Sequence, residues 1–158
     1  MIGFMSVEAQ AEADFDRARR RAFFGQVVAR LRRECSRLLA FDEVREGPLA
    51  HNQRGLGLRV VEVSKIVGSV GRHEAFDRTF MPTKASLAER WKRVDRAFHR
   101  GLDLPAIRLY KVGNSYFVED GNHRVSVARY QGVEWIEAEV TQLYPRSSAG
   151  PDALGSAA

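Results

Sequence analysis

The segment that most constrains the fold is residues 116–129, where a strand pattern changes directly into a helix pattern. Residues 116–118 are apolar and favour a β-strand. Two carboxylates and a glycine follow, and the residues after them favour a short helix that closes at Gly132. A junction of this kind predicts a domain that mixes strands and helices, with polar side chains gathered where the helix begins.

The overall charge points either to an anionic partner or to solubility. The chain has 158 residues, with 25 lysines and arginines against 20 acidic residues, a formal charge of +5 and an isoelectric point near 9.8. Such a surplus attracts nucleic acid, nucleotides or phosphate, but it also serves simply to keep a protein in solution. The length is that of one ordinary domain with a core of its own.

Cysteine content and the absence of targeting patterns predict a cytoplasmic protein. Cys35 is the only cysteine, which excludes an intramolecular disulfide and leaves too few thiolates for a cysteine-based zinc site. The first residues include acids and lack the apolar run of a secretory signal. No stretch approaches the roughly 18 apolar residues that a membrane span needs, so we expect no membrane partner.

Residues 1–47 are expected to form a basic helical arm. Apolar residues recur at three to four positions, which is the spacing of one helical face: Phe23, Val27, Leu31, Cys35 and Leu38. Eight arginines but only one acid, Glu34, lie between positions 17 and 37. The apolar stripe predicts packing, either against the rest of the chain or against a second copy in a homodimer.

The arginines of this arm are also candidates for binding DNA or RNA. Arginine–phosphate contacts would give binding that is sensitive to salt and independent of sequence. The two interpretations are compatible, because one face of a helix can pack while the other binds. The candidate nucleic-acid contacts are Arg17, Arg19, Arg20, Arg21, Arg30 and Arg33.

Residues 58–144 are expected to fold as a small α+β domain, with 145–158 as a disordered tail. The tail consists mostly of Ser, Gly, Ala and Pro, a composition that does not build a core. The predicted strands are 58–63, 106–112, 116–118 and 135–140. A polar loop is expected at 51–57, and Gly113-Asn114 is typical of a two-residue hairpin turn.

A further helix is predicted between the first strand and the hairpin. Ser86 and Glu89 form a capping-box pattern at its start, and Gly101 is expected at its C-terminal cap. The residues of its expected apolar face are Leu87, Trp91, Val94 and Phe98. Trp91 and also Trp135 of the last strand are expected to be core residues, since each lies on an apolar face.

The junction before the short helix carries the residues best suited to chemistry. Helix N-termini leave backbone N–H groups unpaired and bind phosphates, and Gly121 lets a ligand approach the backbone closely. Asn122, His123 and Arg124 follow, and of these Arg124 suits phosphate recognition while His123 donates or exchanges a proton. The two carboxylates, Glu119 and Asp120, suit a magnesium ion or a general base.

A simpler interpretation of the same residues stays open. Asp-Gly is a common turn, so Asp120 would only cap the helix, with His123 and Arg124 on a solvated face.

The pattern Asp-Gly-x-His-Arg after a strand, followed by a short helix and a strand, resembles the signature of the ParB/sulfiredoxin-like superfamily. The resemblance extends from about Val60 to Leu143. It implies a small mixed sheet with flanking helices, and a nucleotide (CTP, ATP or ADP, with Mg²⁺) whose phosphates lie on the helix start. The segment that would lie over this nucleotide contains Gly68, Ser69, Gly71 and Arg72.

Differences from individual members narrow the expected activity. Sulfiredoxins carry a cysteine where this chain has Asn122, and ParB partition proteins continue into a helix-turn-helix domain where this chain has a short tail. The resemblance therefore favours a nucleotide-dependent regulatory domain associated with DNA. The alternatives are a phosphotransferase that resembles the ADP-dependent serine kinases, with Asp120 or Glu74 as base, and a ParB-like nuclease. The candidate catalytic residues are Asp120, His123, Glu119 and Glu74.

Overall fold

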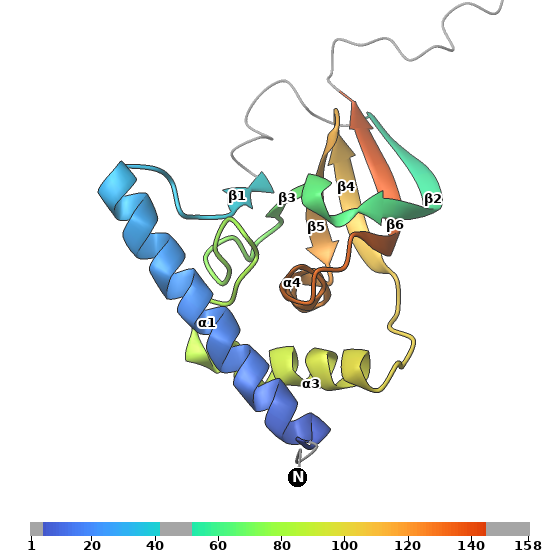
Figure 1. Ribbon diagram of the computed structural model, residues 1–158. Helices are drawn as coiled ribbons and strands as arrows, with labels where there is room; N and C mark the ends of the chain where they lie inside the picture. The colour runs from blue at the N-terminus through green and yellow to red at the C-terminus, as the bar shows by residue number, and fades with distance from the viewer. Residues whose placement is uncertain (1–4, 42–51, 145–158) are drawn as a thin grey trace, which may run out of the picture.

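The computed structural model describes residues 5–41 and 52–144, which form an α+β fold around one six-stranded mixed sheet (Figure 1). The strands are β1 Leu39–Ala40, β2 Asn52–Glu62, β3 Ile66–Ser69, β4 Ile107–Val112, β5 Ser115–Asp120 and β6 Trp135–Tyr144. The helices are α1 Val7–Arg32, α3 Ala88–His99 and α4 Asn122–Tyr130, with short 3₁₀ turns η1 Val63–Lys65 and η2 Ala85–Leu87.

The strand order is β1-β3-β5-β4-β6-β2. The strands β1, β3 and β5 run parallel, β4 pairs antiparallel with β5, and β6 lies parallel to β4 and antiparallel to β2. The hairpin predicted at Gly113-Asn114 is confirmed, because Val112 and Ser115 are paired across that turn and Gly113 has φ +58°. These pairings place the end of β5, and so the start of α4, in the middle of the sheet.

Helix α4 is buried between the sheet and α3. Val125 on α4 and Val118 and Leu109 on the sheet are almost fully buried in one apolar cluster. On its other side α4 meets Trp91 of α3, whose indole N–H donates to Oγ of Ser126 at 2.8 Å. Trp91 is therefore the core residue that the sequence predicted, with its polar group satisfied as burial requires.

Helix α1 lies across α3 and packs through small side chains. Its buried residues are Ala11, Asp14, Phe15, Ala18, Ala22 and Ala29. The Phe15 ring contacts Trp91 at a centroid distance of 5.6 Å. Small alanine side chains let α1 lie close to its neighbours. The buried face of α1 is therefore the alanine-rich one, and not the one that carries Phe23 and Leu31.

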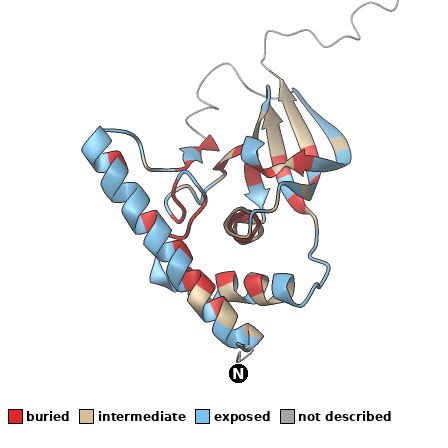
Figure 2. Ribbon diagram, in the orientation of Figure 1, coloured by how far each residue is buried: buried red, intermediate tan, exposed pale blue. Residues whose placement is uncertain are grey.

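Of the predicted apolar stripe of the arm, only one residue packs against the rest of the described chain, and packing against a second copy stays a prediction. Phe23 is 62% exposed and Leu31 is 80% exposed, and Val27 and Cys35 are exposed as well. Only Leu38, which lies beyond the helix, is buried. Figure 2 shows the same division, with the C-terminal half of α1 largely exposed and α4 buried.

Several boundaries also differ from the sequence prediction. The arm is not helical throughout, because β1 lies within it and joins the sheet beside β3. The expected loop at 51–57 is part of β2 from Asn52 onward, since β6 supplies a pairing partner as far as Tyr144. The capping box does not form: the N-cap of α3 is Leu87, without a side-chain hydrogen bond. Trp135 is 56% exposed rather than in the core.

The predicted tail, 145–158, and residues 42–47 of the predicted arm lie outside the described residues. Among the helices that are described, none combines the length and the apolar character needed to cross a membrane.

Gly68 gives a test of the sheet packing. A Cβ at this position would lie 2.5 Å from the Leu39 carbonyl oxygen and 2.6 Å from Cδ1 of Phe117, so neither backbone nor ring leaves room. We expect Gly68→Ala to lower the free energy of unfolding by about 2 kcal/mol through overpacking. Gly55→Ala is the matched control, because a Cβ on Gly55 meets nothing within 4 Å. Equal stability of the two variants in urea unfolding would contradict the close approach of β1 and β3.

Candidate functional site

The turn from β5 into α4 requires glycine. Gly121 has φ +110°, in the left-handed region that residues with a Cβ rarely adopt. A Cβ on this residue would also overlap Cγ2 of Ile107 and lie 2.8 Å from its Cβ. The first turn of α4 is therefore pressed against β4, with its unpaired N–H groups at the end of the central strands.

Arg124 holds this turn in place. Its guanidinium donates to Oδ2 of Asp120 at 2.7 Å, to the Ala106 carbonyl at 3.1 Å and to the Pro105 carbonyl. Three of its five N–H donors are thus taken by the chain itself. Arg124, which the sequence predicts to bind phosphate, braces α4 against the segment before β4, and Asp120 is its partner.

Asn122 and His123 carry buried polar atoms without partners. Asn122 is 8% exposed, and its side-chain oxygen accepts no hydrogen bond from the described residues. Both ring nitrogens of His123 are buried and likewise lack a hydrogen-bond partner in this part of the chain. An unpaired buried polar group costs roughly 1–3 kcal/mol, so a bound molecule that paired with these atoms would be favoured. The N–H of the neutral His123 ring is a donor, whereas its second nitrogen and the Asn122 oxygen are acceptors.

The surroundings of His123 are cationic. Burial, together with the positive charges of Arg90 and Arg72, lowers the pKa of His123 to about 4. Within residues 5–41 and 52–144, no carboxylate forms an ion pair with either arginine. Two guanidinium groups without counter-ions, beside a neutral imidazole and a helix N-terminus, make a site suited to an anion.

The loop between β3 and η2 shapes one wall of this site. Phe76 meets the His123 ring edge to face, at a centroid distance of 5.4 Å. Oδ1 of Asp77 accepts from the backbone N–H groups of Thr79 and Met81 at 2.8 and 2.9 Å, which folds the loop into a tight turn. Phe80 in this turn is fully buried and left-handed, with φ +61°. Such strain persists only where the surrounding packing imposes it.

Residues 68–72, which were expected to lie over a nucleotide, belong partly to strand β3 and partly to the loop that follows it. Gly68 and Ser69 belong to strand β3, where Gly68 permits close strand packing and the buried Ser69 hydroxyl donates to the Val118 carbonyl at 3.4 Å. Gly71 is exposed, with φ +76° and open space around it. Of the four residues in this segment, Arg72 is the one whose charge acts on His123.

The predicted carboxylates do not converge. Successive residues on a strand face opposite ways. Glu119 faces Arg108 on β4, with 3.8 Å between their charged atoms, whereas Asp120 faces Arg124 on α4. Glu74 is exposed on the loop after β3. The structure therefore gives Glu119 and Asp120 separate cationic partners, and these two residues do not form a shared ligand set for magnesium.

The arginines of the arm have unequal surroundings. Arg17 pairs with Asp14 at 3.5 Å, and Arg21 lies over the Tyr130 ring. The other predicted nucleic-acid contacts are exposed: Arg19, Arg20, Arg30 and Arg33. These four side chains flank the exposed apolar face of α1 and remain available to a partner.

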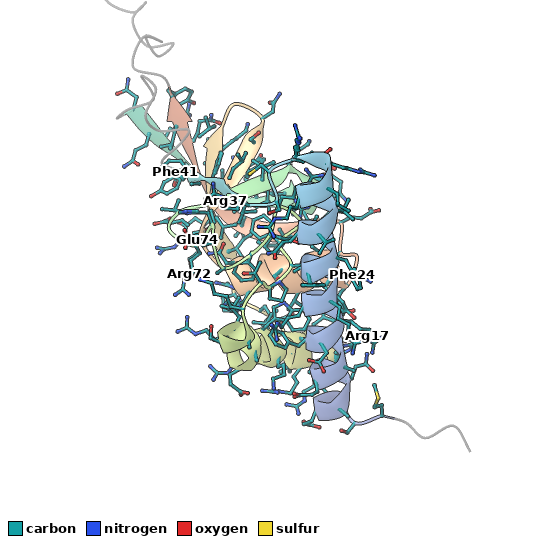
Figure 3. All side chains as sticks on the ribbon, turned by 90° about the vertical axis from the view of Figure 1, so that its left-hand side faces the viewer. Arg17, Phe24, Arg37, Phe41, Arg72 and Glu74 are labelled. Carbon is teal, nitrogen blue, oxygen red and sulfur yellow. The ribbon has the colours of Figure 1, made fainter. Side chains whose placement is uncertain are left out.

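A groove of about 610 Å³ separates the C-terminal half of α1 from the loop after β3. Phe24 and Val28 line it on one side, and Asp77 and Met81 line it on the other. Figure 3 shows Phe24 on α1 and Arg72 at the opposite side of the view.

Sequence reasoning missed Arg90 because nothing in its local sequence distinguishes it from the other arginines of α3. Only the packing of α3 on α4 brings its charge near His123.

Comparison of the chain with protein-family models, with curated proteins and with solved structures gives no significant match. The resemblance noted in the sequence therefore rests on the motif and on the order of elements.

The His123 ring gives a pH test of this site. We expect His123 to titrate near pH 4 in the folded protein, compared with its ordinary value of 6.5 when unfolded. Because the folded pKa is lowered, the unfolded state binds the proton first, and His123 reduces stability as the pH falls from about 6.5 towards 4. NMR titration of the ring protons, with urea-unfolded protein as the reference, measures this directly. A folded-state midpoint at or above 6.5 would show that the ring is solvated.

Proposed function

We propose that this chain is a ParB/sulfiredoxin-like nucleotide-binding domain in which the start of α4 receives the phosphates. The observation that carries the proposal is the buried imidazole of His123, which has no hydrogen-bond partner among the described residues and lies near the charges of Arg72 and Arg90. A phosphate oxygen would accept from the imidazole N–H and from the backbone N–H groups of the first turn. This would remove the cost of leaving the imidazole N–H and the backbone donors unpaired.

The charges support a polyphosphate rather than a neutral ligand. Arg72 comes from the loop after β3, and Arg90 comes from α3, so the two cations approach His123 from different elements. Guanidinium groups suit phosphate because their N–H donors match its oxygens in pairs. CTP, ATP and ADP each present such an anion.

Binding is favoured over phosphoryl transfer or nuclease cleavage. Asp120 is held by Arg124, and Glu119 lies near Arg108, so neither is poised as a free base beside the anion site. A magnesium ion would then accompany the nucleotide on its phosphates, without a carboxylate pair from this chain. Binding without a free base is what we expect of a regulatory domain, in which the bound nucleotide changes the affinity of the protein for a partner.

DNA association through the arm is the second part of the proposal. The arginines at positions 19, 20, 30 and 33 are exposed on and just beyond α1, and their charges would contact phosphates without reading bases. The basic isoelectric point is consistent with such a partner.

Nucleotide titration with two variants of α3 tests the phosphate site. We expect CTP, ATP or ADP with Mg²⁺ to raise the unfolding midpoint of the wild-type chain, because a ligand stabilises the state it binds. Arg90→Ala should weaken binding roughly tenfold or more through loss of a charge-assisted contact. Arg93→Ala is the matched control, an exposed arginine on the same helix.

The same titration followed by NMR should raise the pKa of His123, since a bound phosphate stabilises the protonated ring. If no nucleotide shifts either the midpoint or this pKa, or if Arg90→Ala and Arg93→Ala bind equally well, the phosphate site is refuted.

A salt series tests the arm. We expect DNA binding by the wild-type chain to weaken steeply between 50 and 200 mM salt, on the order of tenfold or more, because condensed counter-ions are released. Changing Arg20 and Arg30 together to Gln should flatten this dependence. The double change of Arg54 and Arg59 to Gln, in exposed arginines of β2, keeps the same net charge and serves as the control. Equal salt slopes in the two double variants would count against α1 as the DNA contact.

A further inference from the structure

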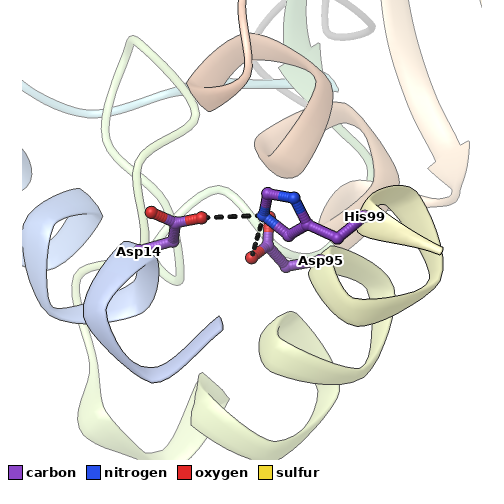
Figure 4. A group of neighbouring side chains, drawn as sticks. All are labelled: Asp14, Asp95 and His99. Carbon is purple, nitrogen blue, oxygen red and sulfur yellow. Dashed lines mark hydrogen bonds and ion pairs between the residues drawn. The ribbon is translucent and has the colours of Figure 1, made fainter. Parts of the chain in front are cut away.

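Three potential metal ligands meet where α1 crosses α3. Nε2 of His99 lies 2.9 Å from Oδ2 of Asp14 and 3.3 Å from Oδ2 of Asp95 (Figure 4). One ligand atom from each residue falls within 4.8 Å of the other two. Asp14 and His99 are 85 positions apart in the chain, so only the docking of α1 creates this group.

Hydrogen bonds fix the outer oxygen of each carboxylate. Oδ1 of Asp14 accepts from the Tyr130 hydroxyl and from the Gln10 amide, both at 3.0 Å. Oδ1 of Asp95 accepts from the Gln131 amide at 2.7 Å. Both Oδ2 atoms are thereby turned inward to His99. Hydrogen bonds of this kind orient the ligands in natural metal sites.

The two inner oxygens differ in their hydrogen bonds. Besides its contact with His99, Oδ2 of Asp14 accepts from the Gln10 amide at 3.2 Å and from the Gln131 amide at 3.3 Å. Asp95 is completely buried, and its Oδ2 has no hydrogen-bond partner among the described residues. A single proton on Nε2 of His99 cannot serve both inward oxygens, and Asp14 lies closer. The buried Oδ2 of Asp95 is therefore the atom of this group that most needs a further partner.

We propose that Asp14, Asp95 and His99 bind a divalent transition-metal ion that fastens α1 to α3. Ligand atoms at about 2.0–2.1 Å from a tetrahedral zinc ion stand roughly 3.3 Å apart, close to the two distances here. Imidazole with carboxylate suits zinc and manganese better than magnesium or calcium, which prefer oxygen alone. The ion binds Nε2 of His99 in place of a proton, leaving the ring hydrogen on Nδ1. A water completes the coordination through the side of His99, which is 24% exposed.

The site is independent of the nucleotide, so it is tested without one. The full chain is stripped with a chelator, dialysed and titrated with Zn²⁺ by calorimetry and by thermal unfolding. We expect one ion per chain and a raised midpoint. Asp95→Asn and His99→Gln should each weaken binding at least about tenfold. Asp16→Asn is the matched control, an exposed aspartate on the same helix as Asp14.

A second measurement uses only the wild-type chain, so it does not depend on the variants folding. Diethyl pyrocarbonate modifies accessible imidazoles, and the modified histidines are located by mass spectrometry. We expect Zn²⁺ to protect His99. Co²⁺ should give the visible absorption of a nitrogen- and oxygen-ligated tetrahedral ion. Lack of saturable binding, equal affinity in Asp95→Asn and Asp16→Asn, preference for Mg²⁺, or unchanged modification of His99 would each overturn the proposal.

Discussion

The burial of α4 between the sheet and α3 is the interaction on which the rest of the structure depends. Val125 faces the sheet, and Ser126 accepts the indole N–H of Trp91 from the other side. Because α4 is packed against the sheet on one side and α3 on the other, its position relative to β5 is fixed, and its first turn lies against β4. The unpartnered atoms of Asn122 and His123 stay buried because the helix has no freedom to expose them.

Local patterns predicted the elements around this helix well. The alternation in β6, the turn at Gly113-Asn114 and the glycine before α4 are all readable within a few residues, and each is present. The start of β2 was not predicted, because Gly55 and Gly57 make its sequence look like a loop. That part of the strand exists because β6 pairs with it along its length, which is a tertiary effect.

The contact face of α1 was missed for a different reason. A search for hydrophobic periodicity favours large residues, and Phe23, Val27 and Leu31 meet that criterion. The face of α1 that is buried in the structure instead carries small residues, among them the alanines at positions 11, 18, 22 and 29. The motif from Gly121 to Arg124 was found from its sequence, but the contacts of Arg124 with the Pro105 and Ala106 carbonyls were not, since these two residues precede β4 and are distant in sequence. Arg90 and the Asp14–Asp95–His99 group depend on contacts between elements and have no local signature.

The pairing of β2 with β6 sets an order for assembly. Asn52 pairs with Tyr144 and Glu62 pairs with Trp135, so β2 can form its ladder only after β6 has been synthesised. By contrast, β4 and β5 are joined by a two-residue turn, and α4 follows β5 directly. During synthesis on the ribosome, β2 therefore leaves the exit tunnel long before its partner exists. Until β6 is made, the long, partly apolar β2 has no strand partner, and an unpaired strand edge of this kind can associate with other chains.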